Sequence, residues 1–113
     1  MHELSVTQSV LEIALTHAER AGAKRVLVID LVIGELASIL DDSVQFYWDM
    51  IAKGTPAEGA LLRFTRLPLE LRCSECGRVF SPDADRYGCP NCSSSHVRVS
   101  QGEELRVESI EVE

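Results

Sequence analysis

The chain has 113 residues, enough for one ordinary domain or for a small core joined to a module that a bound metal stabilises. Its 18 acidic and 11 basic side chains give a net charge of −7, which argues against binding to a nucleic-acid backbone. The N-terminus has no signal-peptide pattern, and the longest apolar run, residues 26–33, is too short to span a membrane. We therefore expect a cytoplasmic protein that binds neither nucleic acid nor a membrane.

The first predicted element is an amphipathic helix that ends at Gly22. Ser5 and Gln8 have the spacing of an N-terminal capping box, in which two side chains bond the free backbone N–H groups of the first turn. Apolar residues recur at helical intervals and predict one buried face. The residues of this face are Leu4, Val10, Leu11, Ala14, Leu15, Ala18 and Ala21.

A strand and a second helix follow. Residues 25–34 are rich in Val and Ile on both faces, which predicts a strand that is central in a sheet or buried on two sides. Asp42 with Gln45 three residues later predicts the start of a helix, and Gly54 ends it. The apolar face of this helix, broadened by Phe46 and Met50, consists of Val44, Tyr47, Trp48 and Ile51.

Two further strands are predicted at residues 61–67 and 103–112, and in both the apolar alternation changes phase, which indicates a bulge or bend. All four cysteines lie between these strands, so the chain must return to the first domain after the cysteine segment. We expect an α+β fold in which two helices pack on a small three-stranded sheet, with an inserted zinc-ribbon-like module. The expected domains are residues 1–68 plus 103–113, and residues 69–102.

The cysteines form two Cys-x-x-Cys pairs, Cys73 with Cys76 and Cys89 with Cys92, separated by twelve residues. Each pair lies on a short turn, so that two turns bring four thiolates into a tetrahedral cage of the kind that holds structural zinc. Four thiolates close the coordination sphere and leave no open position for catalysis. A module of roughly thirty residues buries little apolar surface, so metal binding supplies its free energy of folding.

The four cysteines allow three further interpretations. Two disulfides would need an oxidising compartment, which nothing at the N-terminus supports. A small iron-binding electron carrier uses the same four thiolates, and thiolate ligation alone does not select the metal. A zinc-ribbon adaptor would bind another protein without transferring a metal. By contrast, the sequence offers no catalytic Ser/His/Asp or Cys/His arrangement and no phosphate-binding glycine loop.

The second informative segment is the extreme N-terminus. His2 places the α-amine of Met1, a backbone amide nitrogen and an imidazole in one peptide unit, where they can close fused chelate rings around a single ion. Amine and deprotonated amide donors impose a square-planar field, which suits Ni(II) or Cu(II) and suits zinc poorly. The carboxylate of Glu3 or another nearby side chain would fill the fourth position. A solvated terminal histidine with no metal is the alternative.

Segments spread over the whole chain together resemble the HypA/HybF family of hydrogenase nickel-maturation proteins. These segments are Met1-His2-Glu3, the helix behind it, Gly34-Glu35-Leu36, residues 54–60 (GTPAEGA), the four cysteines, and residues 105–112 (LRVESIEV). The resemblance implies a nickel metallochaperone, not an enzyme, that passes Ni(II) to the [NiFe] hydrogenase large subunit and works with the GTPase of the same pathway.

The same resemblance implies a site for each metal. Ni(II), the transported cargo, falls on the amine of Met1, on the side chain and amide of His2, and on Glu3. Structural Zn(II) falls on the remaining ligands, Cys73, Cys76, Cys89 and Cys92. Supply of urease, and the choice between a monomer and a homodimer, stay open.

Asp41, Asp42 and His96 are further candidates for a nickel ligand. In some relatives an acidic residue before the second helix belongs to the nickel site, but here both aspartates are better explained by the helix N-terminus. His96 follows the last cysteine and is better explained as a surface residue at the start of a strand. Glu35 is expected to be a solvated loop carboxylate, and His17 a residue of the last helical turn.

Overall fold

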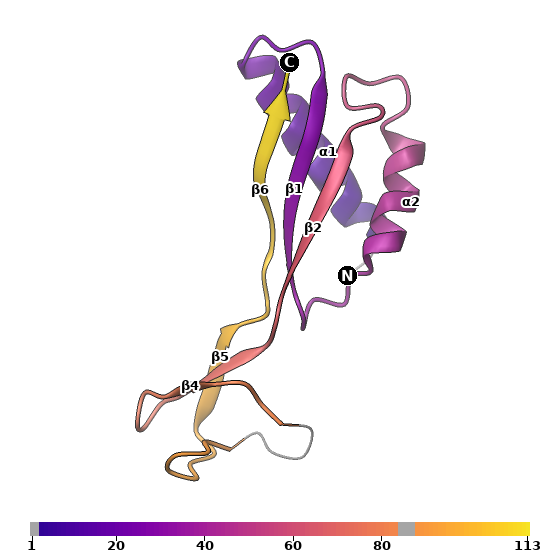
Figure 1. Cartoon of the computed structure of the whole chain (residues 1–113). Helices are drawn as coiled ribbons and strands as arrows, with labels where there is room; N and C mark the ends of the chain where they lie inside the picture. The colour runs from indigo at the N-terminus through magenta and orange to yellow at the C-terminus, as the bar shows by residue number, and fades with distance from the viewer. Residues whose placement is uncertain (1–2, 84–87) are drawn as a thin grey trace. The chain divides into compact units, whose positions relative to one another are not determined.

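A computed structural model of the chain describes residues 3–83 and 88–113 (Figure 1). It confirms the predicted α+β class. The chain divides into two compact units, each of which is assembled from segments distant in sequence. The first unit comprises Met1–Val32, Ser38–Thr65 and Arg106–Glu113, and the second comprises Ile33–Ala37 and Arg66–Leu105.

Two helices and a three-stranded sheet make up the larger part of the fold. In chain order these are α1 (Glu3–Arg20), β1 (Val26–Gly34), α2 (Asp41–Ile51), β2 (Leu61–Leu67) and β6 (Leu105–Val112). The strand order is β2-β1-β6, so β1 is central as predicted. Helix α1 lies behind this sheet and packs against α2 (Figure 1).

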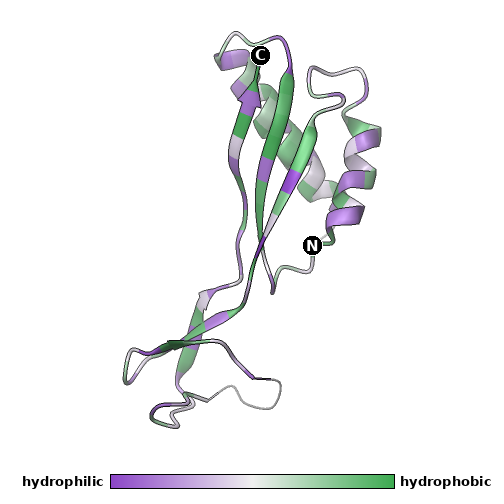
Figure 2. Ribbon diagram, in the orientation of Figure 1, coloured by the Kyte–Doolittle hydropathy of each residue, from purple (hydrophilic) through white to green (hydrophobic). Residues whose placement is uncertain are grey.

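The apolar core of the sheet lies along β1. Ile29, Leu31 and Ile33 are buried, and Figure 2 shows β1 as a nearly continuous hydrophobic strand interrupted at one place. The two helices bury only one face of a sheet, so the other face can accept polar side chains. Asp30, the polar residue within β1, is half-buried and takes part in an ion-pair cluster.

Helix α1 begins earlier than the sequence indicates. Ser5 lies inside the helix rather than at its cap, so the predicted capping box is wrong. The buried face also differs, because Thr7 is fully buried with its hydroxyl donating to the carbonyl oxygen of Glu3 at 2.5 Å, while Leu4 is exposed. The predicted end is confirmed, since Gly22 has a φ of 65° and donates its N–H to the Glu19 carbonyl at 3.1 Å.

Helix α2 buries a narrower face than predicted. Val44 and Trp48, one turn apart, are buried as expected, but Phe46 and Met50 are 62% and 53% exposed. Phe46 lies about 200° around the helix from Val44, so it faces away from the core. The cap prediction is also wrong: Leu40 is the N-cap, and no side chain bonds the free N–H groups there.

The second unit is a small antiparallel sheet beside the cysteines. Its strands are β3 (Glu70–Cys73), β4 (Val79–Phe80) and β5 (Val97–Gln101), in the order β4-β3-β5. The phase change predicted within residues 61–67 falls between Thr65 and Arg66, which are both exposed, and β2 then leads into β3, a strand of a different sheet. Its core consists of Leu71, Cys73, Phe80 and Cys89, with Leu69, Val97 and Val99 packed against them.

A tight crossing of chain segments supports this unit. An added Cβ on Gly34 would lie 2.1 Å from the carbonyl carbon of Gly102, so only glycine fits there. The carboxylate of Glu35 accepts the N–H of Leu69 at 2.6 Å, and the N–H of Glu35 donates to the carbonyl of Leu67 at 2.9 Å. Glu35 thus fixes the backbone between β2 and β3, a contact that the sequence analysis missed.

The ion-pair cluster on the sheet predicts a specific acid sensitivity. Arg63 donates to both oxygens of Asp30, at 2.6 and 2.9 Å, and Ser109 also donates to Asp30 at 2.6 Å. These bonds, that from Arg63 first, lower the pKa of Asp30 to about 2 from the ordinary value of 3.8. The folded-state pKa is depressed, so this stabilisation is present above pH 3.8 and is lost as the pH falls toward 2.

We expect Asp30→Asn to remove that part of the pH dependence. Urea unfolding at a series of pH values should show that the variant loses less stability than the parent protein between about pH 4 and pH 2. Glu12→Gln, an exposed change on α1, is the matched control and should retain the parent's pH profile. Identical profiles for Asp30→Asn and the parent would show that the cluster does not act on Asp30.

Candidate metal centre

The first cysteine pair lies on a turn that follows β3. Cys73 ends the strand, its N–H donates to the carbonyl of Arg78 at 2.9 Å, and its carbonyl accepts the N–H of Gly77 at 3.0 Å. Gly77 has a φ of 78°, a conformation that glycine adopts without the cost a side chain imposes. The turn therefore brings Cys73 and Cys76 to the same side of the backbone.

The second pair repeats this geometry. The N–H of Cys89 donates to the carbonyl of Ser94, and the carbonyl of Cys89 accepts the N–H of Ser93, both at 2.9 Å. Ser93 takes the place of the turn glycine and has a φ of 63°. The sequence offers a turn glycine after the first pair, Gly77, but gives no signal for this serine, because a serine does not predict a positive φ.

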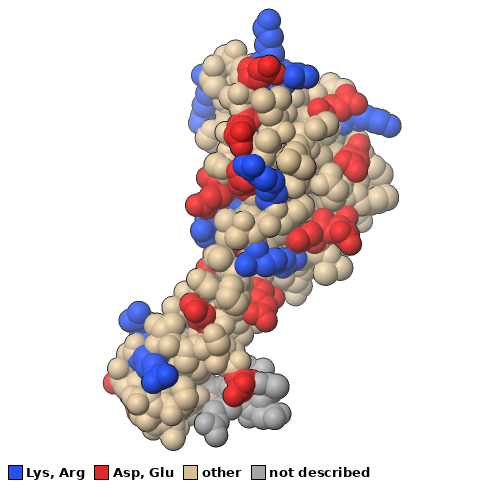
Figure 3. Space-filling view, viewed as in Figure 1, with Lys and Arg blue, Asp and Glu red and all other residues tan. Residues whose placement is uncertain are grey.

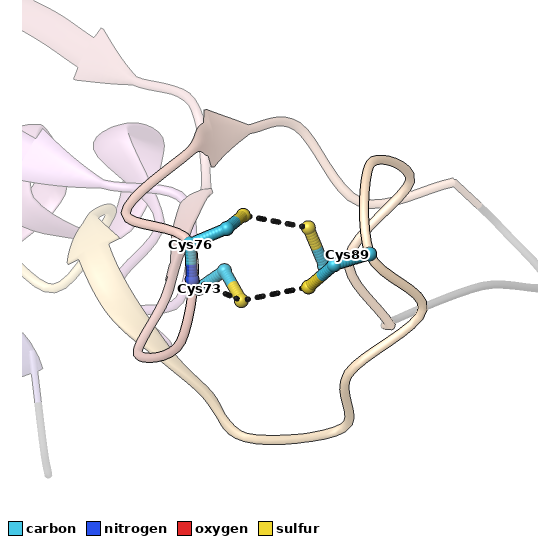
Figure 4. A group of neighbouring side chains, drawn as sticks. Cys73, Cys76 and Cys89 are labelled. Carbon is cyan, nitrogen blue, oxygen red and sulfur yellow. Dashed lines mark hydrogen bonds between the residues drawn. The ribbon is translucent and has the colours of Figure 1, made fainter.

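The two turns bring all four sulfur atoms together (Figure 4). The four Sγ atoms lie within 4.8 Å of one another, with Cys73 and Cys92 at 3.5 Å and Cys76 and Cys89 also at 3.5 Å. Sulfurs bound to one tetrahedral zinc at about 2.3 Å are about 3.8 Å apart, so the observed spacing fits that ion. All four cysteines are free, which contradicts the disulfide interpretation.

Backbone N–H groups favour thiolates at this centre. The N–H of Cys76 donates to Sγ of Cys73 at 3.5 Å, and that of Asn91 to Sγ of Cys89 at 3.4 Å. The N–H of Arg78 is the main cause that lowers the pKa of Cys76 to about 6. The pKa of Cys73 is lowered in the same way, first by the N–H of Cys76.

The fourth thiol shows why this cage needs a cation. The N–H of Ser94 is the largest single influence on Cys92 and lowers its pKa, but Cys73, burial and the other two cysteines together raise it to about 12. Adjacent thiolates repel one another, so the last proton is retained when no cation compensates the charge. A divalent ion that neutralises the thiolates therefore fits both the spacing and the chemistry of the cluster.

The predicted nickel ligands cannot be placed together. Met1 and His2 lie outside the described residues, and Glu3 is the first residue of α1, with a half-exposed side chain. Asp41 and Asp42 occupy the first turn of α2, where a negative charge favours the helix N-terminus. Among residues 3–83 and 88–113, the cysteines are the only group of three or more potential ligands within reach of one ion.

Neither of the other two histidines belongs to the group of four clustered ligands. His96 is exposed just before β5, and its Nδ1 lies 3.0 Å from Oε1 of Glu75, which sits between the first two cysteines. His17 is exposed in the last turn of α1, as expected. His96 is therefore a neighbour of the metal-binding turn through Glu75, a pairing that the sequence did not predict.

The face of the molecule drawn in Figure 3 carries side chains of both charges. In the view of Figure 3, acidic and basic side chains are interspersed. Within the described part of the chain, no helix is both long and apolar enough to cross a bilayer.

Comparisons with known proteins cover the whole chain. Residues 1–112 match a family described as "Hydrogenase/urease nickel incorporation, metallochaperone, hypA". The chain is 42% identical to the hydrogenase maturation factor HypA of a Dehalococcoides mccartyi strain, over 113 residues that cover all of this chain and 95% of the relative. It is 41% identical to the hydrogenase maturation factor HypA of Caldanaerobacter subterraneus subsp. tengcongensis, with both chains covered completely.

Solved structures give the same likeness. A solution structure of a HypA protein matches with a TM-score of 0.80 at 29% identity, over 99% of this chain and 96% of that one. The solution structure of the nickel metallochaperone HypA from Helicobacter pylori matches with a TM-score of 0.71 at 30% identity, over 99% of this chain and 97% of that one.

Proposed function

This chain belongs to the HypA family of hydrogenase and urease nickel-incorporation metallochaperones, and we propose that it binds its nickel cargo through Met1, His2 and Glu3. The family carries nickel for hydrogenase maturation, and the four-cysteine cluster fits a structural zinc site in addition to that cargo. The observation that carries the ligand assignment is His2 at the second position of a chain that matches the family from residue 1.

The proposed nickel site uses few protein ligands. The α-amine, the amide of His2 and its imidazole supply three nitrogen donors, and the carboxylate of Glu3 supplies the fourth. A site at the end of the chain can release its ion without moving a folded core. Copper binds such nitrogen donors more tightly than nickel does, so selectivity has to come from docking and from metal supply.

The zinc has a structural role in this proposal. Cys73, Cys76, Cys89 and Cys92 hold it, and the ion supplies the charge that the clustered thiolates need. We assign nickel handling to residues 1–68 plus 103–113 and zinc binding to residues 69–102. Because four thiolates leave no open coordination position, the protein delivers an ion without catalysing a reaction.

The proposed partners follow from the delivery of nickel to an enzyme. We propose that the protein works in the cytoplasm, receives help from the GTPase of the nickel pathway, and passes Ni(II) to the large subunit of a [NiFe] hydrogenase. Membership of a family described for both hydrogenase and urease supports urease as a second destination.

Metal stoichiometry tests this function against its two competitors. The untagged protein, loaded with nickel and desalted, should carry about one zinc and about one nickel per chain by elemental analysis. An adaptor would carry zinc alone. An electron carrier purified from its native host would contain iron and show a reversible one-electron couple. Either of these two results would refute nickel transport.

A further inference from the structure

Strand β6 is an edge of the three-stranded sheet. It pairs with β1 on one side, where Glu113 donates its N–H to Arg25 at 2.9 Å and Gly34 donates to Glu104 at 2.7 Å. Within the described chain, no strand pairs with its other side. Proteins usually protect such an edge with lysine, proline or a very short strand, but β6 has eight residues and contains neither lysine nor proline.

The apolar side of β6 borders a groove beside α1. Val107, Ile110 and Val112 are half-buried and border a groove of about 260 Å³ between β6 and α1. Its remaining lining residues are Ile13, His17, Ala21, Glu108 and Ser109. Ile13 is 40% exposed there. A further strand added to β6 would extend this apolar surface and bring its own apolar side chains beside the groove.

The other side of β6 is polar. Ser109 donates to Asp30 of β1 at 2.6 Å, and Glu111 accepts from Arg63 of β2 at 2.7 Å. Arg106 donates to Glu108, two residues on, at 2.8 Å. Glu108 and Ser109 are both exposed although they are adjacent, so the alternation changes phase between them.

This phase change makes β6 complementary to itself. In an antiparallel pair with a two-fold axis between Glu108 and Ser109, each residue of one half lies opposite a residue of the other half. If β6 were a regular strand, the two residues of each such pair would point to opposite faces of the sheet. The phase change places the two residues of each pair on the same face. The burial pattern of β6 accordingly reads the same in both directions. The resulting cross-strand pairs are Leu105 with Val112, Arg106 with Glu111, Val107 with Ile110, and Glu108 with Ser109.

Two of these pairs are apolar, one joins opposite charges, and the pair next to the axis joins a carboxylate and a hydroxyl. The two apolar pairs fall on the side of the groove, and the pair of opposite charge falls on the polar side. Arg63 donates to Oε2 of Glu111, and a carboxylate accepts at both oxygens, so Glu111 can also accept from a second arginine. By contrast, the charged residues of β2, the other edge, are Arg63 and Arg66, so self-pairing there offers no opposite charge.

We propose that β6 pairs antiparallel with β6 of a second copy of this chain and thereby joins two three-stranded sheets into one of six strands. The two-fold axis passes between Glu108 and Ser109. Each dimer contains two Arg106–Glu111 pairs, one on either side of the axis, because the interface is symmetric.

Exchange of these charges tests the register. Arg106→Glu alone places like charges opposite each other twice per dimer, and so does Glu111→Arg alone. The dimer affinity of each variant should be lower than that of the parent by about tenfold or more, as measured by sedimentation velocity over a concentration series. An equimolar mixture of the two variants should recover the dimer, since both pairs of residues 106 and 111 in the mixed dimer again join opposite charges. Lys53→Glu, on the surface after α2, is the matched control and should dimerise like the parent.

Hydrogen exchange of the full-length, zinc-loaded protein locates the interface. Amides of residues 105–112 should become more protected as protein concentration rises, while amides of residues 61–67 in β2 should not change. Circular dichroism confirms that both variants are folded, and recovery on mixing excludes misfolding as the cause of weak association. A parent protein that stays monomeric at all concentrations would overturn the proposal. So would a dimer that is indifferent to both substitutions, failure of the mixture to recover, or concentration-dependent protection of β2 instead.

Discussion

Replacing His2 with alanine should abolish tight nickel binding. The substitution removes the imidazole and breaks the chelate that also holds the α-amine and the amide nitrogen, so we expect the nickel affinity to fall by roughly a hundredfold or more. Calorimetric titration of the zinc-loaded protein measures the loss. Zinc content should stay at that of the parent, because the four clustered cysteines can supply all the ligands that zinc needs.

A peptide extension ahead of Met1 tests the contribution of the α-amine separately from that of the side chains. It leaves Met1, His2 and Glu3 in place but converts the α-amine into an amide, so it should weaken nickel binding about as much as His2→Ala does. Glu3→Gln should weaken binding less, since water can replace one oxygen donor. An extended protein that binds nickel with the parent's affinity would show that the amine is not a ligand, and the side chains of His2 and Glu3 would then have to form the site.

Loss of one cysteine should unfold the second unit. Cys73 and Cys89 belong both to the sulfur cluster and to the small core around Leu71 and Phe80. Zinc binding by a structural site contributes on the order of 10 kcal/mol to the folding of a small metal-dependent domain, more than such a core supplies by itself. We therefore expect Cys73→Ser or Cys89→Ser to lose zinc and to become protease-sensitive between residues 69 and 101.

The helices should survive this change. Both α1 and α2 belong to the first unit, which has its own core around Ile29 and Trp48, so helical circular dichroism should persist while the cysteine segment is digested. Ser74→Ala, within the first cysteine turn, is the matched control and should keep zinc and protease resistance. Zinc retained at one ion per chain in either cysteine variant would contradict the structural role.

The sequence by itself determined the features whose atoms are close along the chain. The Cys-x-x-Cys turns place two sulfurs within four residues, and the chelate proposed at the N-terminus is contained in one peptide unit. The central position of β1 was also predicted, because a strand rich in Val and Ile on both faces is buried wherever it lies. Such features depend on residue type and spacing, which the sequence states directly.

Only the tertiary structure decided the features that join distant residues. Glu35 accepts the N–H of Leu69, 34 residues away, and Asp30 accepts from Ser109, 79 residues away. The same holds for the exposure of Phe46, which is apolar and helical but lies on the side of α2 away from the core. Local pattern assigns a residue to a helix or strand, but the partner that it meets depends on how the strands align, and strand order is a property of the whole fold.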